Sequence, residues 1–466
     1  MQRTLNVETT NQIGQRVRLN GWVNARRNMG KIVFLDMRDR SALLQVVIVP
    51  DELDDASKNL IDEIRPEFVL RIEGIVQERG EKQKNEKLPT GTVEILAKTV
   101  QILNKCETPP FEIDKDSVSV NEELRLKYRY LDLRTERLTK NIRARDKVVG
   151  FLRNYLHDQS FIEIETPLLT VSSPEGARDY LVPSRLSPGK FYALPQAPQQ
   201  YKQLLMVAGF EKYFQVARAL RDEDSRGDRQ PEHTQLDMEI SFVTEEDLFD
   251  HAEQMFTAMI KELYPNKKIT ETPWPRITYK EAMEKYKSDK PDLRKNSDDP
   301  DELAFAFIVD FPMYQKNDKG EIEFGHNPFS MPKGGIEALN SEDPFEIVAH
   351  QFDIVCNGYE LSSGAIRNHQ PETMYKAFEI AGYDRATVDK EFAHMVEAFK
   401  YGAPPHGGMA PGIDRLMMIL ENEANIREVI AFPKNSEGTE PMTGAPAEVD
   451  QKLLDELGMS INKLKK

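Results

Sequence analysis

The sequence predicts an α+β protein of two domains, a small β-barrel followed by a larger domain around an antiparallel sheet flanked by helices. Two observations lead to this fold class. Within residues 15–102, apolar and polar residues alternate in five short runs, which is typical of half-buried strands. After residue 135, strands and helices mix without regular βαβ alternation, and no GxGxxG or GxxxxGK pattern occurs. This argues against a doubly wound nucleotide-binding fold.

The first domain, residues 1–104, contains the five runs and one helical stretch, residues 55–64, between the third and fourth run. Five strands with a helix at this place predict a Greek-key barrel of the OB type, whose face commonly binds oligonucleotides. Any other small five-stranded barrel fits the same pattern. The residues that define the runs are Val17, Leu19 and Val23; Val33, Leu35 and Met37; Leu44, Val46 and Ile48; Phe68, Leu70 and Ile72; Val93, Ile95 and Ala97.

A linker is predicted at residues 105–134, because Pro109 and Pro110 precede a charged stretch. The second domain, residues 135–466, opens with a helix. Apolar residues recur there at helical spacing between residues 139 and 160. A strand over residues 161–170, interrupted by Pro167, is expected to follow.

Length and composition fit a multidomain enzyme. The 466 residues exceed what one compact core normally holds, so two or three domains are expected. No run of about 18 apolar residues could span a bilayer, and the first residues lack the pattern of a secretory signal. We therefore expect a cytoplasmic protein without a membrane partner. The two cysteines, Cys106 and Cys356, lack partners at metal-ligand spacing, so neither a disulfide scaffold nor a zinc site is expected.

The net charge of −16 argues, taken alone, against a polyanionic partner. Charge balance is an average, however. Residues 24–31 and 125–145 are rich in lysine and arginine, so an acidic body can still carry a local basic groove.

A charged loop between two strands, within residues 214–242, is the most informative stretch. Taken alone, the second strand would place one face on the core and one in water. Opposed charges crowd the loop, which suits a charged, metal-bearing ligand better than solvent. On the second strand, Leu236, Met238 and Ile240 point one way and Gln235, Asp237 and Glu239 the other, and the loop holds Arg221, Asp222, Glu223, Asp224, Arg226, Asp228 and Arg229.

This stretch resembles motif 2 of the class II aminoacyl-tRNA synthetases, and the order of its residues is similar to that of the bacterial aspartyl family. Residues 142–170 resemble motif 1, which lies at the dimer interface in that family. Residues 406–420, with Arg415 opening a helix behind a glycine-rich strand, resemble motif 3. The three motifs occur in the required order, and the resemblance covers essentially the whole chain. It implies an N-terminal OB-fold that binds the anticodon and a class II synthetase domain.

The resemblance implies a ligase of protein biosynthesis that activates L-aspartate with ATP and Mg²⁺ and transfers it to tRNA(Asp). It implies a homodimer formed through motif 1. Arg221 would meet the α-phosphate and Arg415 the γ-phosphate, with Glu223 as the third catalytic residue, while Asp353 and Glu360 would hold Mg²⁺. Taken singly, each of these charged residues would be expected to form an ion pair at the surface, which is the commoner role of an arginine or a glutamate. The implied ATP site comprises Arg221, Asp222, Glu223, Arg229, Gln230, His233, Glu360, Gly412, Ile413, Asp414 and Arg415.

Two cations set the expected amino-acid specificity. Lys202 and Arg367 match the lysine and arginine with which the family clasps the aspartate side chain, and fixed cations there would reject the neutral amide of asparagine. The implied aspartate site comprises Glu175, Gln199, Lys202, Arg221, Asp237, His326 and Arg367. Glu360 and Arg367 are separated by an odd number of residues. Strict alternation would therefore put them on opposite faces, and we predict a bulge near residues 362–364.

In the barrel, the resemblance implies that Arg27, Phe34, Gln45 and Glu94 read the anticodon. Without the resemblance, a place in the barrel core would be about as well supported for Phe34 as a role in reading the anticodon. Arg226 would meet the acceptor end of the RNA.

Three alternatives stay open. They are a paralogue that makes a free amino acid or amide, an inactive RNA-binding protein, and a non-discriminating enzyme that charges both tRNA(Asp) and tRNA(Asn). The barrel argues against the first and the retained charged residues against the second. Met29 lies in the anticodon loop of the barrel, where the resemblance places the selectivity between the two RNAs.

The chain departs from the family pattern at several places. His233 stands where a phenylalanine usually stacks on adenine, so we expect weaker ATP binding. Ala197, Asn327 and Pro411 also differ, but none removes an essential charge. The largest departure is the long insertion domain of bacterial aspartyl enzymes. It would follow residues 287–294, and here it is missing or reduced to a few residues.

Overall fold

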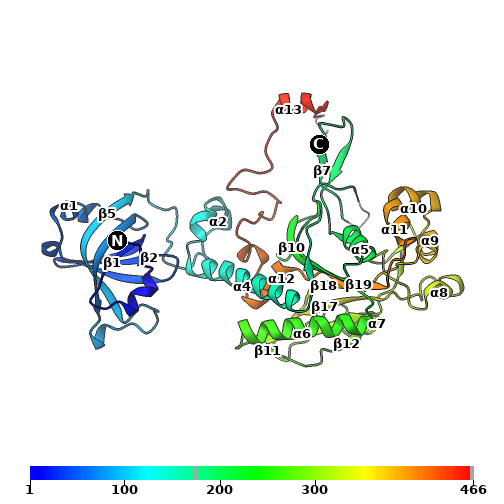
Figure 1. Cartoon of the computed structure of the whole chain (residues 1–466), viewed down its shortest axis with the longest axis horizontal. Helices are drawn as coiled ribbons and strands as arrows, with labels where there is room; N and C mark the ends of the chain where they lie inside the picture. The colour runs from blue at the N-terminus through cyan, green and yellow to red at the C-terminus, as the bar shows by residue number, and fades with distance from the viewer. Residues whose placement is uncertain (173–176, 318, 462–466) are drawn as a thin grey trace. The chain divides into compact units, whose positions relative to one another are not determined.

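The computed structural model describes residues 1–172, 177–317 and 319–461, which form two compact units, Met1–Thr139 and Lys140–Lys466 (Figure 1). The predicted boundaries at residues 104 and 134 fall inside the first unit, and this division into barrel, linker and catalytic domain stays a prediction.

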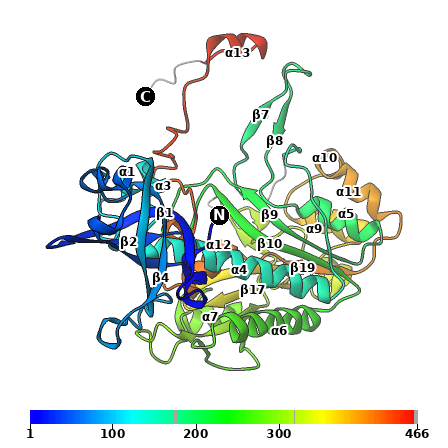
Figure 2. The ribbon, with the colours of Figure 1, turned by 60° about the vertical axis from the view of Figure 1, so that its left-hand side comes forward.

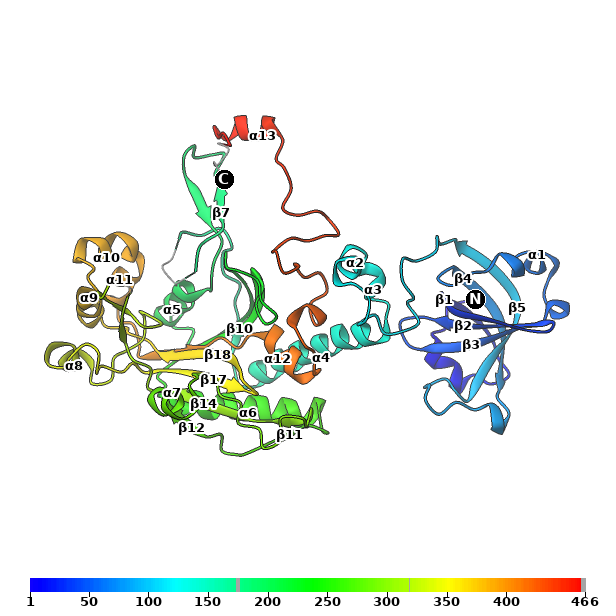
Figure 3. The same ribbon diagram turned by 180° about the vertical axis from the view of Figure 1, so that it is seen from behind.

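The first unit is built on a closed barrel with strand order β1-β2-β3-β5-β4 (Figure 3). The side chains that alternate in the sequence point into its core, because successive residues of a strand face opposite sides. The predicted OB barrel is therefore confirmed. Its strands are β1 (Arg16–Met29), β2 (Ile32–Arg38), β3 (Leu43–Ile48), β4 (Val69–Glu78) and β5 (Val93–Asn104).

The helical stretch predicted at residues 55–64 consists of two short pieces, α1 (Asp55–Lys58) and a 3-10 turn, Ile61–Glu63. Two short helices, α2 (Glu122–Lys127) and α3 (Arg129–Asp132), lie inside the predicted linker. Asp132 is fully buried there and pairs with Arg125 and Arg129. This part of the chain is thus folded rather than extended.

The second unit is built on an eight-stranded sheet with the order β12-β14-β17-β18-β19-β10-β9-β6. Its central pairs are antiparallel, as predicted, whereas the edge pairs β12-β14 and β6-β9 are parallel. The sheet is therefore mixed. Its strands are β6 (Ile162–Glu163), β9 (Lys212–Leu220), β10 (Glu232–Ser241), β12 (Arg276–Thr278), β14 (Phe305–Val309), β17 (Gln351–Cys356), β18 (Tyr359–Ile366) and β19 (His406–Met409).

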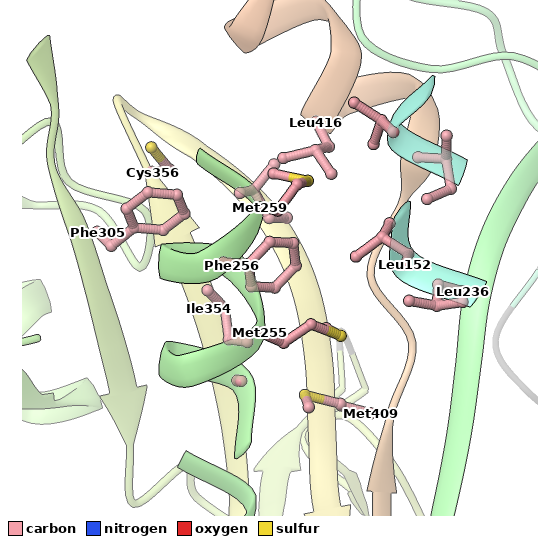
Figure 4. Packing of buried hydrophobic residues seen from close by; sticks show 14 of the residues in the cluster. Leu152, Leu236, Met255, Phe256, Met259, Phe305, Ile354, Cys356, Met409 and Leu416 are labelled. Carbon is pink, nitrogen blue, oxygen red and sulfur yellow. The ribbon is translucent and has the colours of Figure 1, made fainter. Parts of the chain in front are cut away.

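Three helices cover one face of this sheet. They are α4 (Glu136–Asp158), α6 (Glu245–Leu263) and α12 (Ile413–Leu420), and Figure 2 shows α4 and α6 running across it. Their apolar side chains interlock with Leu236 and Met409 of the sheet (Figure 4). The opposite face of β10 is thereby left for polar chemistry.

The remaining helices and strands complete the second unit. The helices are α5 (Gln199–Val207), α7 (Tyr279–Tyr286), α8 (Gly335–Ser341), α9 (Pro371–Ile380), α10 (Arg385–Glu391), α11 (Ala393–Phe399) and α13 (Gln451–Glu456). The small sheets pair β7 (Leu181–Pro183) with β8 (Phe191–Ala193), β11 (Lys268–Ile269) with β13 (Glu302–Leu303), and β15 (Tyr314–Lys316) with β16 (Ile322–Phe324). Among the described residues, no helix is both long and apolar enough to cross a membrane.

Two sequence predictions about strands have different outcomes. The strand predicted over residues 161–170 is wrong in length, because β6 covers only Ile162–Glu163 at the sheet edge. One further bond, from Ile164 to Phe214, precedes Pro167, which has no amide proton to donate. The predicted bulge is confirmed. Opposite Ile354 and Val355, strand β18 skips Leu361, one residue before the predicted range.

Candidate active site

A cavity of about 470 Å³ opens over the polar face of β10 and brings together most of the predicted site. The predicted residues that line it are Gln199, Lys202, Arg221, Glu223, Arg229, Gln230, His233, Asp237, His326, Asp353, Glu360, Arg367, Gly412, Asp414 and Arg415. Asp222 does not line it, and the side chain of Ile413 packs in the hydrophobic core. Glu175 lies outside the described residues.

At one end of the cavity, Lys202 and Arg367 converge on the carboxylate of Glu239. Arg367 donates from Nε to Oε1 at 2.8 Å and from Nη2 to Oε2 at 3.1 Å. Lys202 Nζ lies 3.4 Å from Glu239 Oε2 and 3.0 Å from Asp237 Oδ1. All four side chains are at most 3% exposed, so this end of the cavity is a fixed cluster of two cations and two carboxylates. We call it the acid-binding end.

The pKa values of the two carboxylates shift in opposite directions because their surroundings differ. Burial raises the pKa of Asp237, against the opposing pull of Lys202. Burial also disfavours the charged form of Glu239, but Arg367 and Lys202 together hold its pKa below the usual range. Glu239 is therefore the permanently ionised partner of the two cations.

A glycine makes room for Glu239. A Cβ on Gly408 would lie 2.0 Å from the carbonyl oxygen of Met238 and 2.2 Å from Glu239 Oε2, so no side chain fits there. The neighbouring His406 donates from Nδ1 to the carbonyl of Pro404 at 2.7 Å, which leaves its Nε2 to accept from Gln203 at 3.1 Å. Because burial lowers the pKa of His406, this support is a neutral imidazole.

The other end of the cavity is more open, and we call it the arginine end. Arg415 donates from Nη1 to the Glu360 carbonyl at 2.8 Å and from Nε to the Asp228 carbonyl at 3.1 Å, with the Asp228 carboxylate 3.2 Å from its Nη2. Arg229 pairs with Glu223 at 3.0 Å. These side chains are 24–29% exposed, so they can still meet an incoming anion.

His233, which stands where the family usually has a phenylalanine, lies at the arginine end. Burial lowers its pKa to about 3, and the charges of Arg221 and Arg415 add to this effect. The ring is therefore neutral near pH 7. A neutral imidazole adds no charge to an end of the cavity that already holds Arg221, Arg229 and Arg415.

Asp353 and Glu360 are the carboxylates expected to hold a cation. Asp353 Oδ1 is buried without a hydrogen-bond partner. Burial raises the pKa of Asp353 well above its usual value, and the charge of Glu360 raises it further. No described group of three metal-ligating side chains occurs, but Mg²⁺ is commonly held by one or two carboxylates plus phosphates. The residues present fit that mode of binding.

The bulge at Leu361 explains how both ends share one cavity. The skipped residue makes the number of ladder steps between Glu360 and Arg367 even, so both side chains reach the same face.

Sequence reasoning missed some residues of the site. Glu239 carried a signal, because it lies two residues after Asp237 and so shares its face of β10. Asp289 and Gln235 line the cavity, whereas Glu239 contacts the lining residues Lys202 and Arg367, and Asp289 had no local signal. Of the departures, Ala197 and Asn327 line the cavity, while the Pro411 carbonyl accepts from the Leu236 amide.

In the first unit, the predicted anticodon residues form a chain on the outer face of the barrel. Arg27 donates to Asp36 at 2.9 Å and to Gln45 at 3.3 Å, and Gln45 donates to Glu94 at 2.8 Å. Phe34, paired with Arg27 in the strand register, is half-buried on this face and not in the barrel core. A planar aromatic beside polar groups suits an unstacked base.

Two family profiles match the chain. The family described as "tRNA synthetases class II (D, K and N)" matches residues 121–436, and the one described as "OB-fold nucleic acid binding domain" matches residues 17–103. The chain belongs to the class II tRNA synthetases of the D, K and N group. The cavity lies within the matched part of the synthetase domain, and the Arg27–Glu94 chain lies within the matched barrel.

Relatives of this synthetase family cover nearly the whole chain. The chain is similar to "Aspartate--tRNA(Asp/Asn) ligase" of Chlorobium phaeobacteroides strain BS1, with 42% identity over 95% of this chain and 92% of that protein. It is also similar to "Aspartate--tRNA ligase" of Streptomyces avermitilis, with 42% identity over 97% of each.

Solved structures share the fold. Asparaginyl-tRNA synthetase from Pyrococcus horikoshii superposes with a TM-score of 0.74, at 21% identity over 93% of this chain and 98% of that one. Aspartyl-tRNA synthetase from Entamoeba histolytica superposes with a TM-score of 0.72, at 25% identity over 93% of this chain and 91% of that one.

The alignments also bear on the absent insertion. The alignment with the Chlorobium protein extends over 566 residues, although this chain has only 466. Because the alignment covers 95% of this chain, the relative contains roughly 120 residues without a counterpart here. In this chain, α7 and β13 are joined directly by residues 287–301, which agrees with the missing insertion domain.

Proposed function

We propose that the chain is an aspartate–tRNA ligase, which activates L-aspartate with ATP and transfers the aspartyl group to the 3′ end of tRNA(Asp). One observation carries the proposal. Lys202 and Arg367 are fixed at the acid-binding end of the same cavity that presents Arg221 and Arg415 at its arginine end. A substrate that is an acid at one end and meets a polyphosphate at the other fits this arrangement.

The first step needs positioning and charge, not a protein nucleophile. A carboxylate oxygen of aspartate attacks the α-phosphorus of ATP, the bond to the bridging oxygen breaks, and diphosphate leaves. Arg221 offsets the charge on the α-phosphate, with Glu223 beside it, and Arg415 holds the γ-phosphate. In the second step, a ribose hydroxyl of the terminal nucleotide attacks the adenylate carbonyl and AMP leaves.

Asp353 and Glu360 are the residues that would hold Mg²⁺. When bound, the ion neutralises phosphate charge and fixes the geometry of the nucleotide. The unpartnered Oδ1 of Asp353 and the repulsion between the two carboxylates support this assignment.

The α-ammonium of aspartate is assigned to Asp237, and the side-chain carboxylate to Lys202 and Arg367. Asparagine presents a neutral amide in place of the carboxylate, so it gains no charge pairing with Lys202 and Arg367. Gln199 and His326 line the same cavity and complete the pocket.

The outer face of the barrel is assigned to the anticodon. Phe34 would stack on a splayed base, and Gln45 and Glu94 would bind base edges. A second candidate is a non-discriminating enzyme that also charges tRNA(Asn). The name of the Chlorobium relative, which includes both tRNAs, favours it.

A homodimer through the motif 1 region is part of the proposal. Ile162, Leu168 and Leu169 follow α4 and are 46–52% exposed, which is unusual for clustered large apolar side chains. Light scattering after gel filtration should give twice the mass of the 466-residue chain, and a monomer would refute it.

Charging assays test the function. Purified protein is incubated with ATP, Mg²⁺, radiolabelled aspartate and either tRNA(Asp) or tRNA(Asn), with labelled asparagine and lysine as controls. We expect aspartate alone to be esterified. Charging with asparagine or lysine would refute the amino-acid assignment, and charging of tRNA(Asn) with aspartate would establish the non-discriminating form.

A further inference from the structure

Asp414 is a junction between three elements of the second unit. Its Oδ2 accepts from the backbone amide of Thr234 on β10 at 2.9 Å, and its Oδ1 accepts from Arg145 Nη1 on α4. Asp414 itself belongs to the first turn of α12, next to Arg415, and its side chain is 5% exposed. Both oxygens are therefore engaged within the protein, although the residue borders the cavity.

The elements joined by Asp414 carry the arginine end of the cavity. Thr234 directly follows His233, and Asp414 directly precedes Arg415. The start of α12 is tied to β10 a second time, because the Leu236 amide donates to the Pro411 carbonyl at 2.8 Å. A shift of the Asp414 carboxylate would therefore move both the ring and the guanidinium that face the nucleotide.

Arg145 also balances the negative charge of Asp414 beside the cavity. A bare carboxylate at this place would repel the phosphates of a nucleotide. Arg145 is 18% exposed and lies on the far side of Asp414 in α4, where it also donates to the Val429 carbonyl at 3.3 Å. Its positive charge balances Asp414 without entering the cavity, because Arg145 is not a lining residue.

We propose that Arg145 is a positioning residue for the nucleotide, acting through Asp414 on Arg415 and His233. The inference rests on the proposed function, because it takes ATP as the ligand of the arginine end. It reassigns Asp414, expected from the sequence to bind ATP, to a supporting role.

The test measures aspartate-dependent exchange between ATP and labelled diphosphate for Arg145→Gln. We expect the KM for ATP to rise about tenfold or more, and the KM for aspartate to stay within about twofold, because the acid-binding end does not contact this pair. Arg145→Lys should recover part of the loss, since it restores the charge but not the geometry.

A matched control is available on the same helix. Arg153 forms an ion pair with Glu163 at 3.0 Å, away from the cavity. Arg153→Gln removes the same functional group from α4 and should leave both KM values unchanged.

The double variant Arg145→Gln, Asp414→Asn separates positioning from folding. Removing one partner of a buried pair can unfold a protein, whereas removing both leaves no uncompensated charge. If Arg145 acts through Asp414, the double variant has about the same KM for ATP as the worse single variant. Independent, additive effects would overturn the inference, as would a lower melting temperature with an unchanged KM for ATP. If the wild-type protein shows no exchange with aspartate, the proposed function fails instead.

Discussion

The two ends of the cavity are built in opposite ways. At the acid-binding end, Lys202, Arg367, Asp237 and Glu239 are at most 3% exposed and form ion pairs with one another. At the arginine end, Arg415 and the Glu223–Arg229 pair are 24–29% exposed, and Arg415 donates to the backbone carbonyls of Glu360 and Asp228.

The difference matches the size of what each end must bind. A small acid is read by charges fixed before it arrives, since a pre-organised site loses little entropy on binding. A nucleotide brings several charges and its own cation, so exposed arginines that keep free donors suit it better. Selectivity should therefore depend on the acid-binding end, and sensitivity to solvent conditions on the arginine end.

The largest effect is expected from Lys202→Met. The acid-binding end then loses a cation that no solvent can replace, and kcat/KM for aspartate should fall by roughly a hundredfold or more. Aspartate-dependent ATP–diphosphate exchange measures it. Lys261→Met, on the exposed face of α6, is the control and should behave as wild type. Unchanged aspartate kinetics in Lys202→Met would refute the pocket.

A smaller effect of the same kind is expected from Glu239→Gln. The amide cannot accept both bonds from Arg367, so the KM for aspartate should rise about ten- to a hundredfold while the KM for ATP stays constant. Glu302→Gln, a mostly buried carboxylate outside the cavity, controls for loss of a charge. Equal increases in both KM values would show that the two ends are not independent.

Acidification should affect the two ends differently. The raised pKa of Asp237 means that this carboxylate becomes neutral at a higher pH than an ordinary aspartate, and only its charged form pairs with an ammonium. The KM for aspartate should therefore rise as the pH falls. His233, with a pKa of about 3, stays neutral from pH 5 to 8 and adds no pH dependence to the KM for ATP. Measured KM–pH profiles check both, and an ATP profile that bends near pH 6 and straightens in His233→Phe would contradict this.

The smallest effect is that of salt. Raising the NaCl concentration shortens the Debye length and screens exposed charges more than buried ones. Between about 0.05 and 0.3 M NaCl, the KM for ATP should rise roughly two- to threefold and the KM for aspartate should change less. A potassium acetate series controls for chloride binding. A larger change for aspartate would mean that the acid-binding end is open to solvent.

The sequence was a good guide where the signal is local. Alternation located the barrel strands, and residue order in the charged loop located Arg221 and the strands beside it. The contact between Lys202, Arg367 and Glu239 could not be predicted, because it depends on how the sheet places β18 and β10 on either side of β19 and on the packing of α5 against β10. The same holds for Arg145 and Asp414, which are 269 residues apart. The parallel edge pairs and the short β6 were missed, because edge pairing depends on a neighbour far along the chain.

The bulge at Leu361 shifts by one residue the alternation that decides which side chains of β18 face the cavity. A deletion that kept the bulge would make the number of ladder steps between Glu360 and Arg367 odd and rotate one of these two side chains to the helix-covered side, whereas a deletion that removed the bulge would leave both on the cavity side. A change of length by one residue is therefore tolerated only when the bulge is lost or a new one forms. For anyone who engineers this cavity, the count of residues in β18 is as strict a constraint as their identity.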